Sequence, residues 1–222
     1  MEQIRHTCNC RPLRTPRKLH AVSGTLFGLF LTAHLTINAL SLHPTTFTGV
    51  IGFIHSITAA LPWITVPLIF VPLLFQIGSG LYLLRKEGLA YYTGGCNRGS
   101  TLRYFLQRLT GPVILLFALL HLGTLHNRGW HRVSHDAQTH TGYLAQQLFP
   151  AQGMAFSLLF LTGVAAMSYH LANGAITGNQ VWGIIRKNTA RKYWRHICIC
   201  AGVTLFLAAL AAFIGFGLPG LP

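Results

Sequence analysis

The stretch VPLLFQIGSGLYLLRK, Val71–Lys86, is apolar for most of its length and ends in two basic residues. It completes an apolar run from Ala60 to Leu84, and about 20 such residues suffice for a helix to cross the hydrocarbon core of a bilayer. One amide side chain, Gln76, interrupts the run. A polar side chain in hydrocarbon needs a partner or a function, so Gln76 is the first candidate functional residue.

Four further apolar runs have the length of a membrane-spanning helix. The five predicted spans are Leu19–Leu42, Ala60–Leu84, Tyr104–Leu125, Gly153–Ile176 and His196–Leu218. Pro62, Pro67 and Pro72 predict a kink in the second span. The connection Pro44–Ala59 is apolar, which indicates a segment at the membrane interface rather than an ordinary loop. The sequence therefore predicts an all-α membrane protein, with residues 1–222 forming a single bundle of five transmembrane helices.

Charged residues are few and unevenly placed. They make up 9% of the chain, whereas soluble proteins have about 25%. All but two of the 17 Lys and Arg residues lie in three clusters, at 5–18, 85–108 and 186–195. Because the five spans alternate in direction, these clusters and the N-terminus lie on one side of the membrane. The positive-inside rule predicts that this side is cytoplasmic. The net charge of +14 thus indicates a multi-pass membrane protein and argues against nucleic acid as a partner.

Three of the 12 histidines, His34, His121 and His170, lie well inside predicted spans. At about 1.5 Å of rise per residue, His34 and His121 both lie roughly 22–26 Å from the cytoplasmic face. The span that carries His170 enters from the outer face, so His170 lies about 26 Å from that face, near the cytoplasmic side. Gln76, on the other span of that direction, lies roughly 24 Å in. The spans therefore predict an outer layer of His34 opposite His121 and an inner layer of Gln76 opposite His170.

Paired histidines at one depth are typical of a b-type haem, whose iron takes neutral imidazole nitrogens as axial ligands. Small residues, which let a porphyrin approach the helices, occur in these spans at Ser23, Gly24, Gly28, Gly78, Gly80 and Gly111. The same residues are also expected if they only allow close helix packing. Carboxamides are not established haem ligands, so Gln76 breaks the inner pair.

Four segments resemble a known family in the same order: RKLHAVSGTLFGLFLTAHLTIN (Arg17–Asn38), PLLFQIGSGLY (Pro72–Tyr82), FLQRLTGPVILLFALLHL (Phe105–Leu122) and YHLANGAITGNQVWGI (Tyr169–Ile184). The family is the single-chain, five-span cytochrome b anchor (b558 type) of succinate dehydrogenase and fumarate reductase. The fifth span and the loops are similar only in type. The resemblance implies a protein of the prokaryotic cytoplasmic (inner) membrane that anchors a flavoprotein and an iron–sulfur subunit on its cytoplasmic side. Electrons would pass between the iron–sulfur subunit and membrane quinone, commonly menaquinone.

The resemblance also implies roles for individual residues. Family members hold two b haems, and His34 and His121 match the ligands of the outer one. His170 matches one ligand of the inner haem, and Gln76 stands at the position of the other. The inner haem could therefore be absent, five-coordinate on His170, or replaced by another redox centre.

His20 and Arg108 match residues that lie at the inner interface of the family's members. His20 could hydrogen-bond a propionate, a quinone oxygen or water, and the charge of Arg108 suits a propionate. Ordinary anchoring at the inner face explains both residues equally well.

An iron–sulfur centre is one candidate for the inner layer, because all five cysteines fall on the predicted cytoplasmic side. Mixed Cys and His ligation is chemically possible there. Against it, residues two apart on a helix point about 200° apart, so Cys198 and Cys200 could both be ligands only in an irregular turn. Reduced cysteines that act as small hydrophobes are the alternative. The residues concerned are Cys8, Cys10, Cys96, Cys198 and Cys200, with His6, His20, His170 and His196 near them.

The predicted outer side carries two further candidate groups. His55, Ser56 and Trp63, at the start of the second span, are candidate contacts for an outer quinone. The loop after the third span is rich in possible metal or proton-carrying groups, although a solvated loop explains them equally: His126, His131, His135, Asp136 and His140. No Asp or Glu lies inside a predicted span, so a carboxylate relay is not expected.

Together these features predict a membrane anchor subunit of a succinate:quinone or fumarate oxidoreductase, which transfers electrons through b haem. The chain itself has no predicted catalytic residues, since the succinate or fumarate chemistry belongs to the soluble subunits. The alternatives are a haem-free anchor, the cytochrome b anchor of another quinone-linked dehydrogenase, and a transporter, whose buried polar residues would mark a substrate path.

Overall fold

The computed structural model of the chain describes residues 14–87, 101–127 and 153–217. The described residues form six α-helices and one short 3-10 helix, without strands. The elements are α1 (Arg14–Ala39), η1 (Leu40–Leu42), α2 (Pro44–Ala60), α3 (Pro62–Glu87), α4 (Thr101–Asn127), α7 (Gly153–Trp182) and α8 (Asn188–Gly217). Five of these helices are long and apolar enough to span a membrane. The predicted fold class, an all-α membrane protein with five spanning helices, is confirmed.

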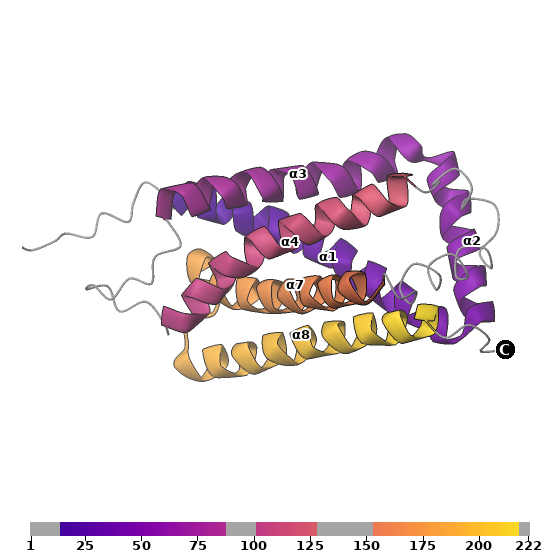
Figure 1. Cartoon of the computed structure of the whole chain (residues 1–222). Helices are drawn as coiled ribbons and strands as arrows, with labels where there is room; N and C mark the ends of the chain where they lie inside the picture. Colours follow the sequence, from indigo (N-terminus) through magenta and orange to yellow (C-terminus); the bar gives the residue numbers. More distant parts are fainter. Residues whose placement is uncertain (1–13, 88–100, 128–152, 218–222) are drawn as a thin grey trace, which may run out of the picture.

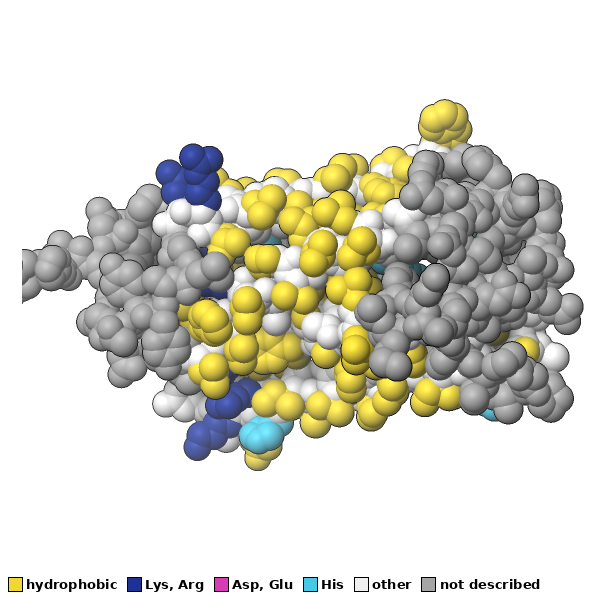
Figure 2. Space-filling model, in the orientation of Figure 1, with side chains coloured by type: hydrophobic (Ala, Val, Ile, Leu, Met, Phe, Trp, Pro, Cys, Tyr) yellow, Lys and Arg dark blue, Asp and Glu magenta, His cyan; other side chains and the backbone are white. Residues whose placement is uncertain are grey.

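The five long helices lie alongside one another, and α2 runs across one end of the bundle (Figure 1). At the other end α1, α4 and α8 begin while α3 and α7 end. Every Lys and Arg of the described ranges lies close to these helix ends or between α7 and α8. Figure 2 shows such side chains at this end, with hydrophobic side chains covering the middle of the molecule. We call this end the basic end.

The apolar connection between the first two spans is the helix α2. It begins at Pro44, a position where the missing backbone N–H breaks no helical hydrogen bond. Phe47 of α2 is fully buried and forms a cluster with Ala212 and Phe216 of α8. This cluster fixes α2 across the end of the bundle, so the connection does not behave as a loop.

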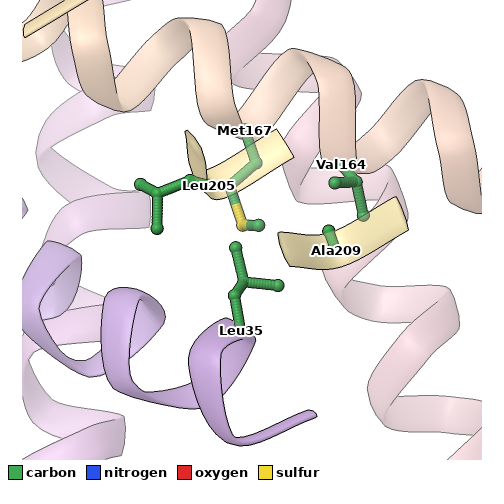
Figure 3. Close-up of a cluster of buried hydrophobic side chains, with 5 residues drawn as sticks. All are labelled: Leu35, Val164, Met167, Leu205 and Ala209. Atoms are coloured by element: carbon green, nitrogen blue, oxygen red, sulfur yellow. The ribbon is translucent and has the colours of Figure 1, made fainter. Parts of the chain in front are cut away.

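The core of the bundle lies where α1, α7 and α8 meet. Figure 3 shows its five buried side chains, which come from these three helices: Leu35, Val164, Met167, Leu205 and Ala209. The helices α3 and α4 flank this core, with α3 packed mainly on α1 and α4 mainly on α7. The two flanking helices make few contacts with each other, so polar side chains near that seam depend on partners from α1 and α7.

The helices around the basic end extend further than predicted. The fourth span was expected to end at Ile176, before a polar segment, but α7 continues to Trp182. The continuation is supported by Asn179, whose Oδ1 accepts a hydrogen bond from the backbone N–H of Ile185 (2.8 Å). Gly183 then ends the helix with a φ of 66°, a conformation that favours glycine. Because α8 begins at Asn188, the connection is much shorter than the predicted loop.

The helix α3 runs without a break from Pro62 to Glu87, with Pro67 and Pro72 inside it. Pro62 itself stands at the start of the helix, directly after the residue that caps α2. The second span therefore remains a single helix of membrane-spanning length, although its interior prolines each remove one backbone donor.

Candidate functional site

His34 of α1 and His121 of α4 face each other near the end of the bundle that carries α2. Their ring centroids are 6.3 Å apart, and the rings are inclined by 72°. Phe30 stacks on His34 (5.5 Å) from the same helix, and Phe117 stacks on His121 (5.6 Å) in the same way. Both pairs are four residues apart on one helix face, which is why the aromatic rings can orient the imidazoles.

The backbone next to His34 has an additional partner. Asn38 Nδ2 donates a hydrogen bond to the His34 carbonyl oxygen (2.7 Å), and the same amide nitrogen lies 3.4 and 3.5 Å from the two ring nitrogens. An amide in this position restricts how far the His34 ring can turn. The ring is therefore held toward His121 by Phe30 on one side and by Asn38 on the other.

The separation of the two ring centroids is comparable with that of two imidazoles that share one metal ion. Imidazole nitrogen binds a first-row metal at about 2 Å, so a metal shared by two imidazoles would separate their ring centroids by about 6 Å. The glycines of these helices give a macrocycle little room, because side chains of neighbouring helices already lie against several of them. A Cβ at Gly28 would lie 2.6 Å from Leu171 Cδ1, and one at Gly24 would lie 3.0 Å from Gln76 Nε2. These two glycines serve close helix packing, the alternative that the sequence left open.

Gln76 makes hydrogen bonds to α1 at both ends of its amide. Its Oε1 accepts from Ser23 Oγ (2.5 Å), and its Nε2 donates to His20 Nε2 (3.1 Å). His20 Nδ1 lies 2.8 Å from Ser79 Oγ, and Ser79 in turn donates to the carbonyl oxygen of Phe75 (2.7 Å). With the amide in this orientation, His20 is neutral and carries its proton on Nδ1. Gln76 therefore completes a continuous hydrogen-bond chain between α1 and α3.

His170 of α7 is bound to α4 rather than to Gln76. Its Nδ1 lies 2.9 Å from Thr110 Oγ1, and its ring lies against Gly111, where a Cβ would be 3.7 Å from Cε1. Thr110 donates its own hydroxyl proton to the carbonyl oxygen of Leu106 (2.8 Å). With that proton directed to the Leu106 carbonyl, His170 donates to Thr110 through Nδ1–H and keeps a lone pair on Nε2, the tautomer that suits a metal ligand. The predicted inner layer thus divides into two separate hydrogen-bonded groups.

The remaining predicted contacts are arranged in different ways. The Arg108 guanidinium lies 4.0 Å from the ring centroid of Tyr104, one turn before it on α4. His55 and Ser56 are exposed on α2, where the Ser56 hydroxyl donates to the carbonyl oxygen of Phe53 (2.7 Å). Trp63, at the start of α3, is 88% exposed. The described chain therefore does not enclose the three candidate quinone contacts, His55, Ser56 and Trp63, in a pocket.

Among the cysteines, Cys198 and Cys200 are described, and they lie on different sides of α8, inside the helix rather than at its start. Cys198 is buried and Cys200 is exposed, which agrees with the 200° argument against joint ligation. In the described ranges no three His, Cys, Asp or Glu side chains gather as a metal site would require. Cys8, Cys10, Cys96, and His131, His135, Asp136 and His140 of the histidine-rich loop lie outside the described residues.

A polar cluster joins α4 and α7 beside His170, and it was not predicted from the sequence. Arg103 donates to Asn173 Oδ1 through Nε (3.1 Å) and Nη2 (2.6 Å). Asn173 Nδ2 donates to Gln107 Oε1 (2.7 Å), and Gln107 Nε2 donates to the His170 carbonyl oxygen (3.3 Å). The spacing was a usable signal: Arg103 and Gln107 are four apart, and His170 and Asn173 three apart, so each pair shares a helix face.

No family model, curated protein or solved structure matches the chain.

Proposed function

We propose that this chain is the electron-transferring membrane anchor of a succinate:quinone or fumarate oxidoreductase and holds one b haem between His34 and His121. The observation that carries the proposal is the pair of imidazoles facing each other from two spanning helices, with ring centroids 6.3 Å apart. The resemblance of four ordered segments to the b558-type anchors supplies the reaction. Bis-imidazole ligation in an apolar bundle is the arrangement that such a haem needs.

In this proposal His34 and His121 would hold the haem iron through their imidazole nitrogens. Phe30, Phe117 and Asn38 act on those two side chains, since they hold the imidazoles in place. When bound, the haem supplies a one-electron carrier between the iron–sulfur subunit and quinone, commonly menaquinone in such anchors. The helices α1 and α4 then hold His34 and His121 at one depth in the membrane.

The inner layer holds no second haem in this proposal. The amide of Gln76 is already hydrogen-bonded at both ends, and His170 is hydrogen-bonded to Thr110 of α4, so Gln76 and His170 would not hold an iron together. We place the flavoprotein and iron–sulfur partners at the basic end, which the positive-inside rule assigns to the cytoplasm of a prokaryotic cell.

A haem-free anchor is the second candidate. It is favoured by the packing of Gly24 and Gly28 against side chains, which leaves less room for a macrocycle along α1. The two candidates differ in one directly observable property, the visible absorption of the purified complex.

The experiment compares His34→Ala with His43→Ala in membranes that contain the whole complex. His43 is the matched control because it is an exposed histidine, just before α2, whose side chain makes no capping hydrogen bond. We expect His34→Ala to abolish the b-type absorption and the succinate-driven reduction of quinone. Succinate oxidation with a water-soluble dye, which needs only the soluble subunits, should persist. A His34→Ala complex that retains both the absorption and quinone reduction would overturn the proposal.

A further inference from the structure

A groove between α7 and α8, open on the lipid-facing surface near the basic end, has no role in the proposed electron transfer. Its volume is about 440 Å³. Most of the lining is apolar, and Val203, 54% exposed, is part of its wall. Five side chains with polar groups interrupt this lining: Arg103, Ser168, Tyr169, Asn173 and Arg195.

The charge in this groove is not balanced by the described chain. Arg103 is bound to the neutral amide of Asn173, and Arg195 is exposed at the same end of the bundle. In the described ranges the one acidic residue is Glu87, at the end of a different helix, α3. Two guanidinium groups beside an apolar surface, without a carboxylate, favour an anionic ligand that brings its own apolar part.

Deeper in the groove lies a hydroxyl without a partner. Ser168 is 5% exposed, and its Oγ forms no hydrogen bond within the described residues. A buried hydroxyl in hydrocarbon is costly unless something accepts its proton. Ser168 lies five residues before Asn173 on α7, and α7 ends at the basic end. Ser168 is therefore about 8 Å farther from the basic end than Asn173, whose amide binds Arg103.

We infer that this groove binds an anionic glycerophospholipid. Its phosphate lies at Arg103 and Arg195, an ester carbonyl accepts the hydrogen bond that Ser168 can donate, and an acyl chain lies along Val203. The order of groups along the groove, cationic, then hydroxyl, then apolar, is the order of complementary groups in such a lipid. Basic pockets between spanning helices are known to select anionic headgroups in this way.

The test uses the full chain, purified in detergent and titrated with phosphatidylglycerol or phosphatidylcholine, with the lipid-bound fraction read by native mass spectrometry. We expect one phosphatidylglycerol to bind in preference to phosphatidylcholine. Arg195→Gln should weaken that binding about fivefold. Arg191→Gln, which removes the same charge from α8 outside the groove, should leave the affinity for phosphatidylglycerol unchanged.

Two further variants probe the deep and apolar parts of the groove. Ser168→Ala should weaken phosphatidylglycerol binding about threefold without destabilising the chain, because its hydroxyl bonds to no described protein group. Val203→Phe should fill the apolar wall and reduce binding. Leu207→Phe is its matched control, since Leu207 lies on the same helix, is equally exposed at 55% and does not line the groove.

Three results would overturn the inference. The first is equal binding of the two lipids by the unsubstituted chain, and the second is an equal effect of Arg191→Gln and Arg195→Gln. The third is displacement of phosphatidylglycerol by inorganic phosphate alone, which would mean that the groove recognises the anion and not a lipid. In the whole complex, detachment of the soluble subunits by Arg195→Gln with lipid binding unchanged would likewise overturn the inference, because the groove would then belong to a protein interface.

Discussion

Gln76 shows how a polar side chain can be accommodated inside a spanning helix. Its Oε1 accepts from Ser23 and its Nε2 donates to His20, so both ends of the amide are satisfied across the seam between α1 and α3. The residue therefore has a structural role between α1 and α3.

Gln76→Leu should lower the free energy of unfolding by about 1–2 kcal/mol, because it removes two hydrogen bonds between helices. Thr25→Val is the control: the Thr25 hydroxyl bonds to the Ala21 carbonyl of its own helix, so its removal should change little. Unfolding in mixed micelles with increasing sodium dodecyl sulfate gives both values. Equal effects of the two substitutions would contradict a structural role for Gln76.

Depth along the spans predicted the neighbour of His34 but not the partners of Gln76 and His170. Depth along each span brought His34 and His121 together correctly, since helical rise is regular. The same argument set Gln76 against His170, yet depth gives no information about which way each helix is turned. In the structure Gln76 faces His20. From the sequence, His20 was expected at the inner interface but not as a partner of Gln76.

At the scale of the elements, small residues decide how closely the helices approach. Gly215 of α8 lies against η1, where a Cβ would be 2.8 Å from both the backbone nitrogen of Leu42 and the carbonyl carbon of Ser41. Backbone atoms cannot move aside as the end of a flexible side chain can. This contact fixes the end of α1 to the end of α8, beside the cluster that holds α2.

Gly215→Ala should therefore destabilise the chain by about 1–3 kcal/mol, as an overpacked core position does. Gly52→Ala on α2 is the matched control, because a Cβ there meets nothing within 4 Å. That substitution should be neutral or slightly stabilising, since alanine has the higher helix propensity. Thermal unfolding of the two variants measures the contrast, and a Gly215→Ala variant as stable as Gly52→Ala would refute the close contact.

The elements themselves were largely predictable, whereas their ends were not. Long apolar runs identified all five spans, because a bilayer requires about 20 apolar residues of any helix that crosses it. Polar residues after Ile176 suggested a loop, but α7 continues through them to Gly183, whose positive φ ends the helix. Side-chain hydrogen bonds such as that of Asn179 stabilise those last turns, and hydropathy alone does not report them.

For the whole molecule, the distribution of charge sets an expectation about orientation. All Lys and Arg residues in the described ranges lie at the basic end, together with the start of α1. The positive-inside rule then places this end in the cytoplasm and the end of α8 on the other side. The side on which the proposed soluble partners would dock, and the leaflet whose lipid would reach the α7–α8 groove, both follow from this orientation.

Reporter fusions at the two termini test the orientation. A fluorescent protein that matures only in the cytoplasm should be active at the N-terminus and inactive at the C-terminus, because five spans separate the two. A phosphatase that needs the outer compartment should give the opposite pattern. Cytoplasmic activity of both C-terminal and N-terminal fusions would contradict five spans, and a reversed pattern would contradict the predicted direction.

The central claim, one b haem between His34 and His121, is tested most directly by the haem content of the purified chain. Pyridine haemochrome spectra, normalised to protein, should give one haem b per chain, none in His34→Ala or His121→Ala, and one in His170→Ala. Circular dichroism of each variant confirms that the helices remain. Two haems per chain, or a haem that survives His34→Ala and is lost in His170→Ala, would contradict the account.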